Sequence, residues 1–271
     1  MKRIAVTGAS GFIGSVTARS LRDHGHTVVP LDRSLGHDIR DADLPALIDG
    51  CDAVIHLAGV LGTSELFDQV EHAVDVNVNG TLRVLRACEK VGASYVGITM
   101  PDCWPSVYQA TKLCGTRLAE SFADAVKMPV THVRAFNAYG HGQALAGPGH
   151  PQKIIPTFSH FAWRGRAIPI WGDGEQTVDL VHVDHIAQCL IVAALTQPGG
   201  TFDAGSGREL SVNTVARLVC DALGIKRRVR YFPMRAGETP GTRLCATVPG
   251  PVGFDHFDWQ RFADIVRSYK S

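Results

Sequence analysis

Two residues in the segment GITMPDCWPSVYQATK, positions 97–112, have the types and the spacing needed for proton transfer: Tyr108 and Lys112. On a helix, residues four apart lie on the same face. A fixed ammonium group beside a phenol favours the phenolate, and a phenolate can take a proton from an alcohol. The pair therefore indicates the acid–base chemistry that accompanies oxidation of an alcohol or reduction of a carbonyl group.

A site of this kind usually contains a further hydroxyl group that holds the substrate oxygen. Thr99, at the end of the apolar segment before Tyr108, is the candidate for this role, and the alternative is a plain residue at the end of a strand. Met100, which follows, cannot donate a useful hydrogen bond. Asp102 stands in a segment with prolines on both sides, and we expect it to be a turn residue before the helix rather than an acid catalyst.

The elements that would position this pair begin with a glycine-rich turn. An apolar segment at residues 2–7 leads into Gly8-Ala-Ser-Gly11-Phe-Ile-Gly14, then into a helical stretch and a second apolar segment that ends at Asp32. Gly8 allows the tight turn, Gly11 lets backbone N–H groups approach a pyrophosphate, and Gly14 lets helix and strand pack closely. Strand, glycines, helix, strand and acid in this order predict a dinucleotide-binding site.

The end of the second strand bears on which dinucleotide binds. Asp32 lies 18 residues beyond Gly14, where a carboxylate can accept hydrogen bonds from ribose hydroxyl groups. A carboxylate also repels a 2′-phosphate, whereas the neighbouring Arg33 could bind one. The sequence therefore favours NAD over NADP as the cofactor.

Strands and helices continue to alternate after this unit. We expect strands at 52–59, 94–99 and 129–136, and helices at 77–92 and from about 106 to 126. This alternation predicts an α/β fold with a doubly wound parallel sheet of the Rossmann type. In such a sheet the ligand lies at the carboxyl ends of the strands.

The composition is that of an ordinary globular protein. The chain has 271 residues, of which 45% are hydrophobic and 20% charged, and its formal net charge is +1. This near-neutral charge gives no reason to expect nucleic acid or a membrane as a partner. Residues 1–14 indicate a strand and a turn rather than a signal peptide, and no apolar run approaches the length of a membrane span. The seven cysteines form no C-x-x-C pair, so we expect reduced thiols in a cytoplasmic protein.

Several motifs in family order resemble those of the extended short-chain dehydrogenase/reductases, especially the nucleoside-diphosphate-sugar epimerases and dehydratases such as UDP-galactose 4-epimerase. The motifs are TGASGFIG (7–14), DIRD (38–41), VIHLAG (54–59), NVNGT (77–81), YQATK (108–112), RAFNAYG (134–140) and GDGEQTVDLVHVDH (172–185). The resemblance covers about residues 1–240. It implies a Rossmann domain over residues 1–140, with returns near 176–200, and a small substrate-binding lobe made mainly of residues 141–271.

The resemblance also implies roles for individual residues, first of all in binding NAD. The pyrophosphate would be held by Gly8, Gly11, Phe12, Ile13 and Gly14, the adenosine ribose by Asp32 and Arg33, the adenine by Asp38 and Ile39, the nicotinamide side by Leu57, Ala58 and Gly59, and a further cofactor bond would come from Asn77. Tyr108 would be the general base or acid. Lys112 would hold the nicotinamide ribose and lower the pKa of the tyrosine, and Asn137 would contact the sugar nucleotide.

The sequence departs from this pattern on the substrate side. Seven residues separate Met100 from Tyr108, whereas relatives have a longer segment there. Val178 stands where relatives have an arginine that clamps the sugar-nucleotide diphosphate, so a charge-assisted pair is lost. Arg235 matches a second phosphate-binding arginine and is retained. The tail after residue 247 matches poorly and is shorter than in relatives, which predicts a trimmed C-terminal lobe.

Other charged groups invite weaker interpretations. Three arginines could compensate for Val178, namely Arg164, Arg166 and Arg243. His182 and His185 are three residues apart, but no third ligand is evident, so we expect no metal site. The basic run at 226–230 is expected to be a solvated strand edge rather than a nucleic-acid patch. The segment 141–156, rich in glycine and proline, is expected to be a loop that leads into the substrate lobe.

Three functions remain open on the sequence. The preferred one is an NAD-dependent epimerase or dehydratase-like enzyme acting on a nucleotide sugar through a transient keto-sugar, with Tyr108 as general base and acid. The second is a reductase or dehydrogenase of a smaller carbonyl or alcohol substrate, which Val178 and the short loop favour. The third is a non-catalytic dinucleotide-binding protein, which Met100 motivates. By the resemblance, the helices at 77–92 and from 106 would form a homodimer interface.

Overall fold

Six parallel strands form the central sheet of the chain, in the order β10-β5-β4-β3-β1-β2, within the residues that the computed structural model describes, 1–147 and 151–270. The strands are β1 (Arg3–Thr7), β2 (Thr27–Leu31), β3 (Ala53–His56), β4 (Ser94–Thr99), β5 (Val130–Ala135) and β10 (Gly200–Ala204). The predicted α/β fold with a doubly wound parallel sheet is confirmed.

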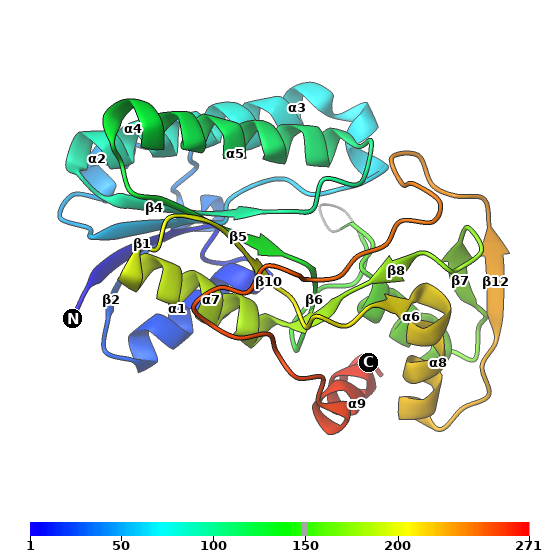
Figure 1. Ribbon diagram of the computed structural model, residues 1–271. Helices are drawn as coiled ribbons and strands as arrows, with labels where there is room; N and C mark the ends of the chain where they lie inside the picture. Colours follow the sequence, from blue (N-terminus) through cyan, green and yellow to red (C-terminus); the bar gives the residue numbers. More distant parts are fainter. Residues whose placement is uncertain (148–150, 271) are drawn as a thin grey trace.

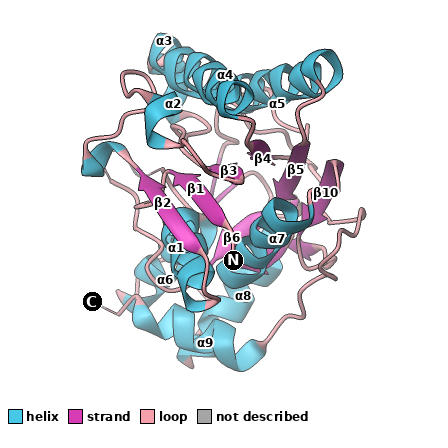
Figure 2. Ribbon diagram, turned by 90° about the vertical axis from the view of Figure 1, so that its left-hand side faces the viewer, coloured by secondary structure: helices cyan, strands magenta, loops and turns pink. Residues whose placement is uncertain are grey.

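Helices cover both faces of this sheet (Figures 1 and 2). One face carries α1 (Phe12–Asp23) and α7 (Val183–Thr196), and the other carries α2 (Leu44–Leu47), α3 (Val70–Val74), α4 (Thr81–Val91) and α5 (Val107–Val126). Successive residues of a strand point to opposite faces. Accordingly Ile4 and Val6 of β1 pack in the cluster that contains Leu190 of α7, whereas Ala5 packs in the cluster that contains Leu85 of α4.

The chain order creates a crevice at the carboxyl end of β1. From β1 the chain passes to β2 on one side of the sheet, and later to β3 on the other side. The register places Thr7 beside both Leu31 and His56. Ligands of doubly wound sheets bind where the strand order reverses in this way. The glycine-rich turn follows Thr7 and therefore lies in this crevice.

The helix expected at 77–92 starts earlier in the structure. It begins with α3 at Val70, continues through a π-helical turn, η3 (Asp75–Gly80), and ends with α4 before Gly92, whose φ is +74°. The predicted glycine stop is confirmed, but the predicted start is wrong, because residues 70–76 contain no glycine or proline that would end a helix. Such π-helical turns are frequent at functional sites.

A smaller lobe packs beside the carboxyl end of the sheet (Figure 1, right). Its elements are β6 (Asn137–Tyr139) paired with β9 (Leu180–His182), β7 (Ile168–Trp171) paired with β12 (Val229–Phe232), β8 (Thr177–Val178) paired with β11 (Leu210–Ser211), and the helices α6 (Ile154–Trp163), α8 (Val212–Leu223) and α9 (Trp259–Ser268). Tyr139, Phe158, Ile170 and Phe262 belong to its core. Between β9 and β11 the chain returns to the large sheet as α7 and β10 (Figure 1).

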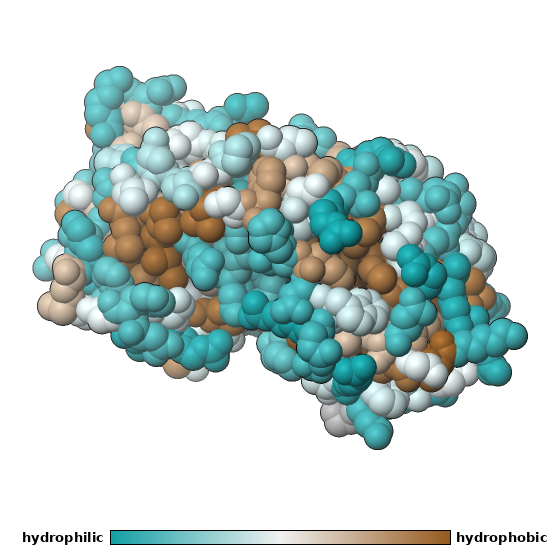
Figure 3. All heavy atoms as spheres, turned by 60° about the horizontal axis from the view of Figure 1, so that its bottom comes forward, coloured by the Kyte–Doolittle hydropathy of each residue, from teal (hydrophilic) through white to brown (hydrophobic). Residues whose placement is uncertain are grey.

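The molecular surface and the cysteines give little information about a ligand. On the face drawn in Figure 3, apolar side chains form separate patches between polar ones. No helix within residues 1–147 and 151–270 is long and apolar enough to cross a membrane. All seven cysteines are unpaired in the structure, and four of them are buried, namely Cys51, Cys88, Cys189 and Cys220. In the expected loop at 141–156, residues 148–150 lie outside the described residues, and from residue 154 the chain is helical in α6.

Candidate active site

The turn between β1 and α1 has no room for larger residues at two of its glycines. Gly8 has a φ of +69°, and a Cβ on it would lie 2.8 Å from the backbone nitrogen of Ala58. A Cβ on Gly14 would lie 2.0 Å from the carbonyl oxygen of Gly8. Both contacts are with backbone and cannot be relieved by a side-chain rotation. The turn and the start of the next loop therefore pack together as the predicted dinucleotide site requires.

The N-terminus of α1 is the part of this turn that suits an anion. Gly11 is the N-cap residue, and no side chain caps this end of the helix. Phe12 and Ile13 are its first two residues, and their side chains pack against Val183 of α7. Their backbone N–H groups belong to the helix N-terminus, where N–H groups and the helix dipole attract a phosphate. The pyrophosphate of a dinucleotide fits this position.

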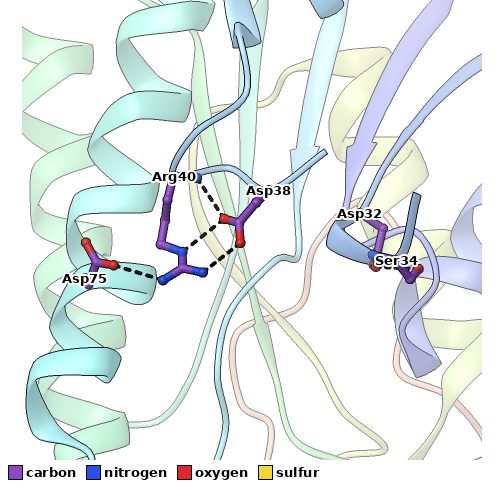
Figure 4. Close-up of polar contacts among 5 residues, drawn as sticks. All are labelled: Asp32, Ser34, Asp38, Arg40 and Asp75. Carbon is purple, nitrogen blue, oxygen red and sulfur yellow. Dashed lines mark hydrogen bonds and ion pairs between the residues drawn. The ribbon is translucent and has the colours of Figure 1, made fainter. Parts of the chain in front are cut away.

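Asp32 is held rigidly one residue beyond the end of β2 (Figure 4). One carboxylate oxygen accepts hydrogen bonds from the backbone N–H and the hydroxyl group of Ser34, at 2.9 and 2.8 Å, and the other accepts from the N–H of Ser10 at 3.1 Å. Burial opposes ionisation, but these bonds and the charge of Arg33 outweigh it and lower the pKa of Asp32. Arg33 starts the short helix η1 (Arg33–Leu35). The acid is thus fixed beside the glycine turn as predicted, and its contact with ribose stays a prediction.

Asp38 is already bound by an arginine in the structure (Figure 4). Arg40 donates to its two carboxylate oxygens, at 3.0 and 2.8 Å, and also to Asp75 of η3 at 3.1 Å. The hydrogen bonds from Arg40 outweigh burial and lower the pKa of Asp38 to about 2. Ile39 is 4% exposed, with its side chain in the core below Gly80. Contact of these two residues with adenine stays a prediction, and the role of Arg40 was not foreseen.

A directed chain of hydrogen bonds fixes the loop expected at the nicotinamide. The hydroxyl oxygen of Thr7 accepts from the N–H groups of Leu57 and Ala58, both at 3.1 Å, and lies 2.7 Å from Nδ1 of His56. Nε2 of His56 lies 3.0 Å from the hydroxyl oxygen of Thr81. Because the threonine oxygen already accepts two bonds, it donates to Nδ1, and Nε2 carries the proton. Burial lowers the pKa of His56 to about 3, so the ring stays neutral.

Asn77 fixes the rest of this loop. Its side chain accepts from the N–H of Val60 at 2.9 Å and donates to the carbonyl of Val60 and the hydroxyl group of Thr111, both at 3.1 Å. A Cβ on Gly59 would lie 2.9 Å from the amide oxygen of Asn77. Asn77 is 1% exposed. It was predicted to bond the cofactor, and in the structure its amide joins the nicotinamide-side loop to α5.

Tyr108 and Lys112 lie on the first two turns of α5, four residues apart on one helix. Ser106 starts this helix, because its hydroxyl oxygen accepts from the N–H of Gln109 at 3.1 Å. Lys112 is 8% exposed, and its charge lowers the pKa of His56. Thr111, the residue before Lys112, accepts a hydrogen bond from Asn77, which also binds Val60, so this turn of α5 lies beside the loop that follows β3. The structure brings the proposed acid–base pair to the edge of the sheet that carries the glycine turn.

Burial determines the pKa of Tyr108 in the protein without its cofactor. Lys112 was expected to lower the pKa of Tyr108, but burial raises it to about 12. Burial also lowers the pKa of Lys112 to about 8. The physical reason is the same for both groups, since desolvation penalises phenolate and ammonium alike.

Thr99 lies at the end of β4 and is 6% exposed. Its hydroxyl group pairs with that of Thr116 on α5 at 2.9 Å. This bond joins β4 to α5 and uses the hydroxyl group that was expected to hold the substrate oxygen. A role for Thr99 toward substrate stays a prediction. Met100 is half-buried at the next position, and Asp102 lies in the turn before α5, as expected.

Asn137 lies in β6, and Arg235 follows β12 in the small lobe. The buried amide oxygen of Asn137 in β6 has no hydrogen-bond partner among the described residues, and neither has Nε of Arg235. Arg235 pairs with Glu238, donates to Gln152 at 3.2 Å, and lies 4.7 Å above the ring of Trp171. Orphaned buried polar atoms of this kind call for a ligand or water.

Val178 has apolar surroundings, whereas Lys153, a residue that the sequence did not single out, lies near other charged groups. Val178 is 8% exposed within the core of the small lobe, so this position offers no charge. Lys153 is the N-cap residue of α6, next to Gln152, which contacts Arg235. Burial and the charge of Arg235 lower the pKa of Lys153. A lysine in the segment 141–156 was the available signal, but nothing in the sequence indicated that it lies near Arg235.

The three arginines considered as substitutes for a charge at Val178 are engaged elsewhere. Arg164 bonds Nδ1 of His160 at 2.9 Å, Arg166 lies 5.0 Å above the ring of Phe161, and Arg243 pairs with Glu209. The structure therefore gives no support to these three arginines as replacements for the missing charge.

The two histidines of the 172–185 motif have structural roles. His182 caps α7 by accepting from the N–H of Asp184 at 3.2 Å, and His185 lies 3.6 Å from the sulfur of Cys189. No group of three potential metal ligands occurs in the part of the chain that the structure describes. The basic run at 226–230, which leads into β12, is mostly exposed, as expected for a solvated strand edge.

Comparison with known proteins identifies the family. The model of the family described as "NAD dependent epimerase/dehydratase family" matches residues 4–100 and 101–205. UDP-glucose 4-epimerase of Mycolicibacterium smegmatis is 29% identical over 282 residues, with 89% of each chain covered. dTDP-glucose 4,6-dehydratase of Streptomyces griseus is 28% identical, with 87% of this chain and 83% of that protein covered.

A solved structure supports the same assignment. MoeE5 in complex with UDP-glucose and NAD is 27% identical, superposes with a TM-score of 0.83, and is covered over 97% of its chain and 98% of this one. A UDP-N-acetylglucosamine 4-epimerase of Methanobrevibacter ruminantium, at 22% identity, shares the fold with a TM-score of 0.87. The resemblance inferred from the motifs is thus confirmed. The chain belongs to the NAD-dependent epimerase/dehydratase family and is an enzyme of that class with NAD as its cofactor.

Proposed function

We propose that the protein is an epimerase of a nucleoside-diphosphate sugar and works through a transient keto-sugar. The observation that carries the proposal is the position of Tyr108, half-buried, and Lys112, buried, four residues apart on the first turns of one helix. NAD supplies the acceptor and donor of hydride in such a reaction. The residues of the chain then have to move one proton and hold the sugar.

Tyr108 has the proton-transfer role. It takes the proton from the sugar hydroxyl as the C–H bond is oxidised, and returns it when the keto-sugar is reduced. Burial favours the neutral phenol, so the ionised form depends on nearby positive charge. Lys112 provides that charge, together with the positive ring of the oxidised cofactor. Its pKa of about 8 means that the lysine is mostly protonated at neutral pH.

The substrate class is inferred from the cations of the small lobe. Arg235 and Lys153 lie near each other at the start of α6, and the orphaned Nε of Arg235 suits a phosphate oxygen. Asn137, with its orphaned amide oxygen, suits a sugar hydroxyl group. The relatives support a sugar nucleotide, since the MoeE5 complex contains UDP-glucose.

Epimerisation is favoured over dehydration by the state of Asp102. Expulsion of water from a sugar needs an acid that faces the reacting carbon. The carboxylate of Asp102 instead accepts a hydrogen bond of 2.5 Å from the side chain of Gln109. We expect the active form to be a homodimer through α4 and α5, which light scattering of the purified protein would test.

A second function is kept open by one observation. Because Val178 is part of the core, the site lacks a cation that the sequence motif of relatives contains. A reductase or dehydrogenase of a smaller carbonyl or alcohol substrate would need no diphosphate clamp. The two functions differ in cofactor balance, since an epimerase recycles its NAD, whereas a dehydrogenase releases NADH at each turnover.

Calorimetric titration of the NAD-loaded protein with UDP, dTDP and GDP tests the substrate class. We expect one nucleotide to bind tightly, and Arg235→Ala to weaken it by about tenfold or more, the cost of one charge-assisted bond. Arg217→Ala is the matched control, because Arg217 forms an exposed ion pair with Asp221 on α8. Failure of every nucleotide to bind, with NAD retained, would sink the sugar-nucleotide proposal.

The bound nucleotide then selects the sugars to assay. Interconversion of two epimers without net NADH supports the epimerase, and Tyr108→Phe should reduce the rate by about 10²- to 10⁴-fold while NAD still binds. Stoichiometric NADH release from a small alcohol would instead establish the second function.

A further inference from the structure

Gln109, the residue after Tyr108, is buried. Its side chain forms hydrogen bonds with the short loop before α5. Gln109 is 7% exposed. Its amide oxygen accepts hydrogen bonds from the N–H groups of Cys103 and Trp104, at 2.9 and 2.6 Å. Its amide nitrogen donates to the carboxylate of Asp102 at 2.5 Å. One side chain of the catalytic helix therefore binds three consecutive residues of the loop.

The loop at 101–105 needs such an anchor. It has no regular secondary structure, and its two prolines provide no N–H group for a backbone ladder. Backbone N–H groups that lose contact with water require partners, and here one side chain supplies the partner for two consecutive, partly buried groups. Without the side chain of Gln109, the loop would still connect β4 to α5, but it would lose the hydrogen bonds that hold it in one conformation.

The anchored loop is in contact with a second segment, residues 235–242, which we call the strap. The hydroxyl group of Thr239 donates to the carbonyl of Cys103 at 3.2 Å. A Cβ on Gly237 would lie 3.1 Å from Cβ of Ser106, so the strap passes closely over the start of α5. The strap begins with Arg235, whose guanidinium pairs with Glu238 within the same segment.

We propose that Gln109 is a positioning residue for the substrate side of the site: it holds the loop 101–105 as the seat of the strap, and so sets the position of Arg235. Gln109 takes no part in proton transfer, although it follows Tyr108 directly. The identity of the anion that Arg235 meets rests on the proposed function, whereas the seating of the strap does not. This arrangement gives the short loop a role, because its carbonyl at Cys103 accepts a hydrogen bond from the strap, which also passes close to Thr63 and Phe67.

Hydrogen exchange of the NAD-loaded protein tests the seating without any substrate. Gln109→Ala should speed exchange by about tenfold or more in peptides covering 101–106 and 235–242, and leave the peptide of the glycine turn unchanged. Gln260→Ala is the matched control, since Gln260 makes the same amide-to-carboxylate bond, to Asp264 at 3.0 Å, on the exposed face of α9. Faster exchange in the loop with an unchanged strap would overturn the proposal.

Nucleotide binding tests the consequence for Arg235. In Gln109→Ala the dissociation constant of the nucleotide, and the KM of its sugar, should rise about five- to tenfold, with kcat changed less than about twofold. Thr239→Val removes the contact with Cys103 from the other side and should have the same effect. In the double variant the dissociation constant and the KM should rise no further than in the more affected single variant, because both substitutions break the same connection between Gln109, the loop and the strap.

The outcomes separate this proposal from the proposed function. If the wild-type protein binds no nucleotide, the proposed function fails, and hydrogen exchange alone decides the role of Gln109. If Gln109→Ala does not fold, Thr239→Val alone must still loosen the strap and raise KM. A fall in kcat at constant KM in either variant would contradict a positioning role and point to proton transfer.

Discussion

His56 should make the stability of the protein depend on pH in mildly acidic solution. The ring is 1% exposed and lies between the hydroxyl groups of Thr7 and Thr81. Burial, with a smaller effect of the charge on Lys112, lowers its pKa from 6.5 to about 3. The unfolded chain protonates the imidazole below about pH 6.5, whereas the folded protein keeps it neutral. Protons therefore bind preferentially to the unfolded state, and stability falls as the pH decreases from 6.5 toward 3.

The size of the effect follows from the shift. Each pH unit below about 6.5 costs about 1.4 kcal/mol for one such group, so lowering the pH from 7 to 5 removes about 2 kcal/mol of the free energy of unfolding. Replacing His56 by glutamine removes this group. The variant should lose about 1–3 kcal/mol at pH 7, because the bonds to Thr7 and Thr81 are weakened. At pH 5 the difference in unfolding free energy between the wild-type protein and the variant should be smaller by about 2 kcal/mol.

Urea denaturation of the cofactor-free protein at pH 7 and pH 5 measures both numbers. The quantity to compare is the change in unfolding free energy between the two pH values, since other buried histidines, such as His132 with a pKa lowered to about 4, add to the loss in every variant. His24→Gln, at an exposed position of the chain, is the control and should keep the wild-type pH dependence. If His56→Gln also keeps it, the ring is not held neutral and the directed chain of bonds is wrong.

Three further substitutions test the site. Gly14→Ala should abolish NAD binding measured by calorimetry, because its Cβ would lie 2.0 Å from the carbonyl oxygen of Gly8; retained binding would contradict the tight turn. Thr99→Val should lower kcat less than tenfold if the bond to Thr116 is its main role, and a loss above about 100-fold would restore its predicted catalytic role. Arg40→Met should cost less than about 1 kcal/mol in chemical denaturation, since its ion pairs are partly exposed; a larger loss would show that they are strongly coupled.

The sequence was sufficient for those features that are local in the chain. The glycine turn, Asp32 and the Tyr108–Lys112 pair could all be predicted, because their geometry follows from spacing on one strand, turn or helix. The alternation of elements likewise determined the parallel sheet. The start of the helix was predicted too late, although residues 70–76 contain no glycine or proline that would interrupt a helix. The bonds of Asn77 to Val60 and Thr111 could not be predicted, because they connect three separate segments and leave no local signal.

The substrate side could be predicted only in part, for a physical reason. The pKa of Tyr108 depends on how deeply the fold buries it, and the contact of Arg235 with Gln152 spans 83 residues. Neither the pKa of Tyr108 nor the contact of Arg235 with Gln152 follows from a local sequence motif. The contact between Thr239 and Cys103 spans 136 residues and was equally out of reach. The departures from the family pattern, such as Val178, indicate where the substrate side is altered. The contacts of Arg235 and Thr239 depend on the three-dimensional fold and could not be predicted from them.

The first turns of α5 connect the two halves of the site through different faces of one helix. Tyr108 and Lys112 are the proposed acid–base pair, Thr111 accepts the hydrogen bond from Asn77, and Gln109 binds the loop 101–105. A rigid helix transmits a displacement of one face to the others. A substitution at Gln109 that tilted the helix would therefore disturb both sides, whereas one that released only the loop would disturb the substrate side alone. For this reason the ratio of the effects on nucleotide and NAD affinity, rather than either affinity by itself, distinguishes a local role of Gln109 from a change in the whole helix.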